Sequence, residues 1–409
     1  MHFAHASAQR AWDYCTQKLY AEKTHLIYDF CVSGNPAAAS GALPPPDENR
    51  ACHPNPCGYG TGMEDSALNG GILLDAVLRH FEATGDPAAR DWAGRLFAGL
   101  YACATAGTRG FVARSVCPAD GVSHYPNSSR DQYTNLVFGL WRFYRSPLAD
   151  DGQRASIRRV AADIAERMLA EVIPENGYAL LRDDGRPGKF CEMWGVLEPH
   201  EYLRMPMCLA AAYDMTGDER YGAQYRRYRG EASERSLPIR YESLWHLYAA
   251  LQMQFSVRLL YDVDADAPYH ARYEQLLAGA AAYCRAYVLE NAPKLCAGDL
   301  TRYNYVYEPW RDLPLQPIPH MGDPACLKPV RNEANSAFYP LRDFGNAVHT
   351  LCLCDGAADG AVRDALLAVM NAIDYDAHSS GGPLDLLGGY CALERALRVP
   401  DDTQSNILP

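Results

Sequence analysis

The feature that most constrains the fold of this 409-residue chain is the spacing of its apolar residues. They recur three and four positions apart along almost the whole chain, which is the period of an amphipathic α-helix, and the alternating runs typical of β-strands are scarce. The pattern therefore predicts an all-α protein. We expect twelve helices, at residues 7–21, 64–84, 90–106, 131–146, 153–172, 201–216, 219–229, 241–262, 268–289, 336–354, 360–373 and 384–398.

The joints between these helices are of two kinds, and the short kind repeats. The segments "FEATGDPAAR" (81–90) and "YDMTGDERY" (213–221) both place Thr-Gly-Asp between two helices. Glycine readily adopts the left-handed conformation after a last helical turn, and aspartate caps the first turn of the next helix. Two such joints indicate stacked pairs of antiparallel helices.

Long connections alternate with the short joints. They fill 31–62, 108–129, 173–200 and 295–335, and they are rich in Trp, Tyr, Arg, His and Asn. Long irregular segments inside a compact chain commonly carry function, and this composition is not typical of disorder. In a ring of helical hairpins the short joints would lie on one rim and the long connections on the other, so we expect the functional site on the long-connection rim.

Composition and charge exclude some classes of function. Hydrophobic residues make up 48% and charged residues 22% of the chain, which is typical of a globular protein with a large core. A formal charge of −12 argues against a nucleic-acid partner, because phosphate binding requires a basic face. No run of about 18 apolar residues is present, so we expect no membrane partner.

Most of the 14 cysteines lie in apolar helical stretches, as buried free thiols do, and this favours a reducing cytoplasm. The first residues lack the apolar segment of a secretory signal, although a periplasmic location would apply if a signal peptide had been removed. Cys52 and Cys57 flank His53 in a Pro/Gly-rich loop, but a zinc site needs about four ligands and no second pair lies nearby. We therefore expect no metal and no cofactor.

Asp131 is a candidate catalytic carboxylate at the start of an expected helix. In "NSSRDQY" (127–133), Ser129 and Gln132 match a capping box, so a cap is available without Asp131. An aspartate in a first turn can simply complement the helix dipole. Because Asp131 follows a long connection, however, it lies on the rim where a site is expected.

Asp65 occupies a similar place in "GYGTGMEDSALNGG" (58–71). Thr61 and Glu64 match a capping box, which gives Glu64 a structural duty and leaves Asp65 free for chemistry. The glycines that follow, Gly70 and Gly71, each cost a helix about 1 kcal/mol relative to alanine. We expect either close helix packing or close approach of a ligand to compensate.

Two carboxylates on one rim suggest the acid and base groups of glycoside hydrolysis, which typically uses an Asp/Glu pair. Aromatic side chains on the same connections can stack on sugars, and arginine and histidine can bind a sugar carboxylate. The candidate substrate-binding residues are Arg130, His124, Tyr133, Arg114, Tyr59, Trp194, His200, Trp245, His246 and Arg331.

The twelve helices, the alternating joints and the Thr-Gly-Asp repeats resemble the six-hairpin glycosidases, whose fold is the (α/α)6 barrel or toroid. The resemblance implies a single catalytic domain over 1–409, with the long loops named above. The motif Arg-Asp-Gln-Tyr (130–133) is similar to the helix start that carries the general acid in unsaturated glucuronyl and rhamnogalacturonyl hydrolases. The related β-glucuronidases of glycoside hydrolase family 154 also act on uronic acids. By this resemblance Asp131 would be the proton donor and Asp65 its partner.

The "W-x-R-G-N-G-W" segment of the rhamnogalacturonyl enzymes is absent, which favours a saturated terminal glucuronide. We therefore expect a β-glucuronidase-like glycosidase that acts on an oligosaccharide or glucuronide; a homo-oligomer is compatible with the sequence. Three alternatives stay open: an unsaturated glucuronyl hydrolase, a toroid-fold polysaccharide lyase using His124, Tyr125 and Asn127, and a non-catalytic carbohydrate-binding scaffold.

Overall fold

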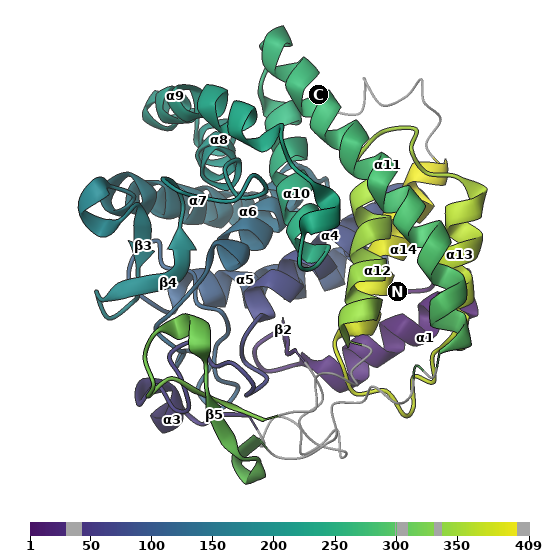
Figure 1. Cartoon of the computed structure of the whole chain (residues 1–409), viewed down its shortest axis with the longest axis horizontal. Helices are drawn as coiled ribbons and strands as arrows, with labels where there is room; N and C mark the ends of the chain where they lie inside the picture. The colour runs from purple at the N-terminus through teal and green to yellow at the C-terminus, as the bar shows by residue number, and fades with distance from the viewer. Residues whose placement is uncertain (30–42, 299, 301–309, 331–337, 399–409) are drawn as a thin grey trace.

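The fold is a closed ring of six helices inside a second ring. The computed structural model describes residues 1–29, 43–298, 300, 310–330 and 338–398 (Figure 1). Each inner helix contacts the next along the chain, and the last contacts the first, which closes the ring. The inner helices are α4 (Ser66–Thr84), α6 (Arg130–Arg145), α8 (Arg204–Thr216), α10 (Tyr248–Val263), α12 (Phe338–Leu351) and α14 (Gly382–Arg398).

The outer ring covers the inner one. Every outer helix packs against the inner helix that precedes or follows it in the chain, and the first helix of the chain packs against the last. This is the six-hairpin (α/α)6 toroid that the sequence predicts. The outer helices are α1 (Ala6–Tyr14), α5 (Ala88–Thr105), α7 (Asp151–Glu171), α9 (Glu219–Ser236), α11 (Ala267–Ala297) and α13 (Gly360–Ala372).

The two kinds of joint separate the two rims, as predicted. Chain segments that lead from an inner to an outer helix are short, whereas those that lead back to the next inner helix are mostly long. Gly85 and Gly217 end α4 and α8 in the left-handed conformation, with φ of 71° and 72°, and the Asp218 side chain accepts a hydrogen bond from Arg220 N to cap α9. The Thr-Gly-Asp joints therefore work as their chemistry predicts.

Short elements lie in the connections that precede inner helices. Three antiparallel hairpins pair β1 (Tyr20–Ala21) with β2 (Leu26–Ile27), β3 (Ala179–Leu181) with β4 (Pro187–Glu192), and β5 (Leu315–Pro317) with β6 (Leu327–Pro329). A short helix, α3 (Pro46–Arg50), lies in the first connection.

Four helix ends differ clearly from the sequence prediction. Helix α1 ends at Tyr14 instead of 21 and is followed by a π-helical turn at Cys15–Leu19, and α9 continues to Ser236 instead of 229. Helix α10 begins at Tyr248 instead of 241, because Tyr241–Ser243 form a separate 3-10 turn. Helix α11 continues to Ala297, past Pro293, and a Glu290–Lys294 ion pair of 2.7 Å bridges its last turns.

The glycines of α4 serve helix packing. A Cβ atom added at Gly71 would lie 2.2 Å from the carbonyl oxygen of Asn135 in α6, and one at Gly70 would lie 2.9 Å from the Leu100 side chain. Backbone therefore meets backbone between α4 and α6, which decides between the two explanations that the sequence allowed.

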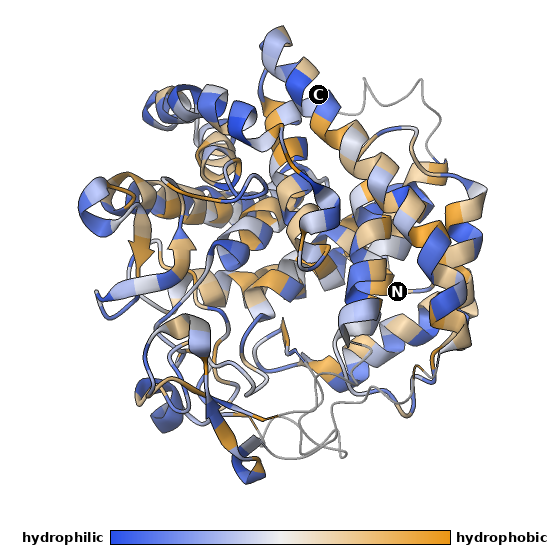
Figure 2. Ribbon diagram, viewed as in Figure 1, coloured by the Kyte–Doolittle hydropathy of each residue, from blue (hydrophilic) through white to orange (hydrophobic). Residues whose placement is uncertain are grey.

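Figure 2 shows apolar and polar residues on different faces of outer helices such as α1 and α13, as expected for helices that cover a core. Among the described residues, no helix combines the length and the apolarity that crossing a bilayer requires.

Candidate active site

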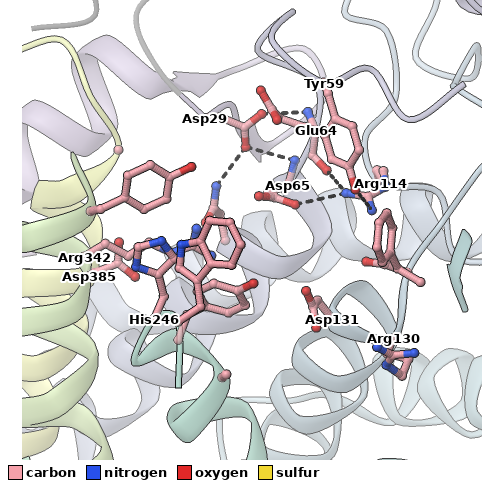
Figure 3. Close-up of a pocket in the computed structure, with 18 of the residues that line it drawn as sticks. Asp29, Tyr59, Glu64, Asp65, Arg114, Arg130, Asp131, His246, Arg342 and Asp385 are labelled. Atoms are coloured by element: carbon pink, nitrogen blue, oxygen red, sulfur yellow. Dashed lines mark hydrogen bonds and ion pairs between the residues drawn. The ribbon is translucent and has the colours of Figure 1, made fainter. Parts of the chain in front are cut away.

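A cavity of about 800 Å3 opens where the inner helices begin (Figure 3). All six inner helices reach it through their first turns or the residue just before, and the positive ends of their dipoles therefore surround it. The residues that they contribute include Asp65, Asp131, Arg204, Tyr248, Arg342 and Asp385. The connections add, among others, Asp29, Tyr59, Glu64, Arg114, His200, Glu201, Trp245, His246 and Lys328.

Asp65 lies at the N-cap of α4 and is held by side chains from two other segments. Its Oδ1 accepts hydrogen bonds from Gln132 Nε2 at 2.7 Å and from Arg114 Nη1 at 3.2 Å. The Asp65 side chain is 26% exposed, so it reaches the cavity. The arrangement fixes an acceptor carboxylate in the site.

Asp29 positions Asp65 through its backbone. Its carboxylate accepts hydrogen bonds from the backbone N–H groups of Glu64 at 2.7 Å and Asp65 at 2.9 Å, and from Asn69 Nδ2 at 3.1 Å. Burial and the nearby carboxylates of Asp65 and Glu64 raise the pKa of Asp29 well above its ordinary value. Asp29 thus fixes the backbone just before α4, whereas the first-turn amides of Ala67 and Leu68 bond to the Arg114 carbonyl and to Gln132 Oε1.

Both capping boxes predicted from the sequence are wrong. Glu64 lies two residues before α4 begins, and its Oε1 accepts a hydrogen bond from Gly60 N at 2.8 Å instead of from Thr61 N. Ser129 makes no side-chain cap for α6, and Gln132 reaches across to α4, where its Oε1 accepts from Leu68 N at 3.0 Å. Contacts between neighbouring inner helices replace contacts within one helix.

Asp131 forms an ion pair with Arg204, the first residue of α8. Burial alone would raise the pKa of Asp131, but the charge and the hydrogen bond of Arg204 bring it below its ordinary value. Asp131 is therefore ionised at neutral pH. The Arg204 side chain is 2% exposed, and its buried Nε has no acceptor among the residues that the structure describes.

The pKa of Asp385, in the first turn of α14, is shifted in the opposite direction. The residue is 4% exposed, and burial raises the pKa of its carboxyl group to about 7 despite the nearby Arg342 charge. The Arg342 guanidinium lies over the Tyr248 ring, 4.2 Å from its centroid. Two first-turn aspartates of the same ring thus hold their protons very differently.

Eight of the predicted residues come together around the cavity. They are Asp131, Asp65, Arg130, Arg114, Tyr59, His200, Trp245 and His246. The sequence missed Asp29, Arg204, Tyr248, Arg342 and Asp385, although four of these lie at inner-helix starts, the position that drew attention to Asp65 and Asp131. No local signal distinguishes Asp29.

Three predicted substrate-binding residues lie outside the cavity lining. His124 bonds to Asp183 at 3.1 Å, the Tyr133 hydroxyl is buried and bonds to the Gly110 carbonyl, and Trp194 packs edge-on against Tyr228 with ring centroids 4.6 Å apart. Each of these side chains contacts a neighbouring loop or the core instead of the cavity. The sequence shows that a residue lies in a long connection, but it does not show in which direction its side chain points. Arg331 lies outside the described residues.

Three of the retained residues have changed roles. Arg114 donates to the Glu64 carbonyl at 2.9 Å and to the Tyr59 hydroxyl at 3.0 Å, and Arg130 pairs with Glu192 at 2.9 Å and with Glu201. These arginines therefore organise acceptors of the protein itself. Burial and the Arg204 charge lower the pKa of His200 to about 4, so His200 is neutral and cannot attract an anion by charge.

No protein-family model matches the chain, and no curated protein is similar to it in sequence. Solved structures that it resembles include glycoside hydrolases. The GH76A alpha-1,6-mannanase from Salegentibacter sp. HEL1_6 is 11% identical, with a TM-score of 0.48 over 96% of this chain and 99% of its own.

An inactive variant of the same mannanase in complex with alpha-1,6-mannotriose is also 11% identical, with a TM-score of 0.47 and the same coverage. The family 76 mannosidase Bt3792 from Bacteroides thetaiotaomicron VPI-5482 is 10% identical, with a TM-score of 0.31 over 96% of this chain and 100% of its own. The toroid assignment rests on the closed ring of helix contacts described above.

Proposed function

We propose that the protein is a glycoside hydrolase that removes a terminal uronic acid from an oligosaccharide or glucuronide. One observation carries the proposal: a single cavity holds two aspartates whose pKa values are moved apart, Asp131 downward and Asp385 to about 7. When the pKa values of two carboxyl groups differ in this way, one group can donate a proton at neutral pH while the other stays charged.

The pKa values revise the roles that the resemblance implied. Asp385 keeps its proton up to about pH 7, so it is the better donor to the glycosidic oxygen as the bond to the anomeric carbon breaks. Asp65, an acceptor of two hydrogen bonds, is the partner that activates water or attacks the anomeric carbon. Asp131, ionised beside Arg204, stabilises the positive charge that develops on the sugar ring.

The choice of a uronic acid rests on three cationic side chains in the cavity lining. Arg204, Arg342 and Lys328 line the cavity together with six helix N-termini. Arg204 pairs with Asp131 through Nη1 and lines the cavity beside that carboxylate, so a substrate carboxylate would meet its positive charge. A local field of this kind outweighs the net charge of the chain at short range.

The lyase alternative has less support. Tyr125 and Asn127 are each 1% exposed, and neither they nor His124 lines the cavity. Tyr248 does line it, but burial and the nearby Asp131 raise its pKa to about 12, which makes its phenol a poor general base at neutral pH.

The test compares nitrophenol release from p-nitrophenyl β-glucuronide and from the matched neutral β-glucoside. We expect the glucuronide to be preferred, and we expect Asp385→Asn and Asp131→Asn each to lower kcat by roughly 10²- to 10⁴-fold with unchanged far-ultraviolet circular dichroism. Arg204→Met should reduce the preference for the glucuronide. Glu198→Gln, at an exposed site outside the cavity lining, is the matched control.

An unsaturated uronyl disaccharide, followed by loss of its ultraviolet absorbance, provides a second arm. Turnover in this arm alone would overturn the saturated-glucuronide proposal in favour of an unsaturated glucuronyl hydrolase. Absence of turnover with every uronide would overturn the proposed function.

A further inference from the structure

Trp245 is a large apolar side chain left in solvent at the edge of the cavity. All six tryptophans of the chain fall within the described residues, and Trp245, 90% exposed, is the exposed one. Burying an aromatic side chain of this size typically stabilises a fold by about 1.5–3 kcal/mol. Exposed apolar surface beside a polar cavity is characteristic of ligand binding.

The backbone around Trp245 is fixed to the inner ring. Trp245 lies between the 3-10 turn Tyr241–Ser243 and α10. The next residue, His246, bonds through Nδ1 to Asp343 Oδ2 at 3.1 Å, and Asp343 Oδ1 accepts from Leu247 N at 2.9 Å. The His246 ring also stacks on Tyr339, with centroids 4.3 Å apart and an interplanar angle of 9°. Trp245 is therefore presented from an anchored turn, with its ring centroid 5.9 Å from that of His246, which is labelled in Figure 3.

Trp245 is far more exposed than the charged groups of the cavity. The proposed reacting carboxylates and Arg204 belong to the starts of α4, α6, α8 and α14, and their side chains are less than a third exposed. Trp245 belongs to the connection before α10 and is almost wholly exposed. A terminal sugar held by the charged groups would leave the rest of its chain to pass Trp245 at the exposed edge of the cavity.

We propose that Trp245 is a stacking platform for the sugar to which the removed uronic acid is attached. The substrate is then an oligosaccharide whose second ring presents an apolar face, as pyranose rings do to aromatic side chains. A cavity of about 800 Å3 lies in the upper part of the range of roughly 300–1,000 Å3 that accommodates ligands larger than one ring. This inference rests on the proposed function and adds the nature of the leaving group to it.

The experiment measures kcat/KM on two glucuronides that differ in the leaving group, a glucuronyl disaccharide and methyl β-glucuronide. Trp245→Ala should lower kcat/KM for the disaccharide by about tenfold and leave that for the methyl glucuronide within about twofold, since methanol offers no ring to stack. Trp245→Phe should recover most of the loss. Val196→Ala, at a fully exposed apolar site outside the cavity lining, should change neither substrate.

Two results would overturn the platform: equal losses on both substrates, which would assign Trp245 to the terminal sugar, and no loss on either. If the wild-type protein hydrolyses no uronide, the proposed function fails separately. Calorimetric titration with a neutral disaccharide then still tests the platform, which predicts binding that weakens in Trp245→Ala but not in Val196→Ala.

Discussion

Asp131 and Asp385 show how neighbours give one residue type two chemical characters. Both lie in the first turn of an inner helix and both line the cavity. Arg204 reaches Asp131 and lowers its pKa, whereas burial governs Asp385 and raises its pKa to about 7. A first-turn aspartate is ordinarily stabilised in its charged form by the helix dipole, so the state of Asp385 reflects its loss of water.

The protonation of Asp385 predicts a pH dependence of stability. The ordinary pKa of an aspartate is 3.8, and the folded protein raises that of Asp385 to about 7. Between these values the folded state holds a proton that the unfolded chain has released, so this contribution to the free energy of unfolding falls as pH rises from about 4 through 7. Asp385→Asn should remove it, seen as a smaller change in Tm between pH 4 and 8. Parallel Tm profiles for the two proteins would contradict the raised pKa.

At the scale of the helices, the ring depends on contacts that leave no space for a Cβ atom. Gly71 of α4 meets the Asn135 backbone of α6, and Gly345 of α12 meets the Asp385 backbone of α14, where an added Cβ would lie 2.3 Å from the carbonyl carbon. The second contact also supports the carboxylate proposed as proton donor. Small residues thus bring the starts of neighbouring inner helices to their working distance.

Gly71→Ala should destabilise the protein by about 1–3 kcal/mol, because the overpacked methyl group must push two helix backbones apart. Gly94→Ala in α5 is the control: a Cβ there would meet only the Gln153 side chain at 3.5 Å, so the gain in helix propensity should stabilise by up to about 1 kcal/mol. Urea unfolding of the two variants measures both effects. Changes of the same sign would contradict the packing argument.

At the scale of the whole molecule, buried charges join inner helices away from the cavity. Asp75 of α4 accepts from Arg79 Nε at 2.6 Å, from Arg142 Nε of α6 at 3.0 Å and from His349 Nε2 of α12 at 2.9 Å. The side chain of Asp75 is fully buried, yet the charges of Arg79 and Arg142 and the His349 hydrogen bond lower its pKa. Burial lowers the pKa of His349, so the neutral ring donates to Asp75.

Asp75→Ala should destabilise the fold by about 3–5 kcal/mol, because it leaves buried arginines without their acceptor. The kcat measured well below the Tm of the variant should change little, since Asp75 lies outside the cavity lining. Asp91→Ala removes an exposed ion pair with Arg95, 2.9 Å long, and should cost less than about 1 kcal/mol. Equal shifts in thermal unfolding for the two variants would show that the buried cluster does not hold the ring.

The sequence by itself determined the twelve helices, the alternation of short and long joints, and the rim on which Asp65 and Asp131 lie. These features depend on local chemistry: the helical period of apolar residues, and the glycine and aspartate of the Thr-Gly-Asp joints. Tertiary structure decided the rest. Arg204 reaches Asp131 across 73 residues, Asp29 supports Asp65 across 36, and Gln132 leaves its own helix start to bond Asp65. Burial and pairing of charges are properties of neighbours in space, and they set which carboxyl group holds a proton in the cavity.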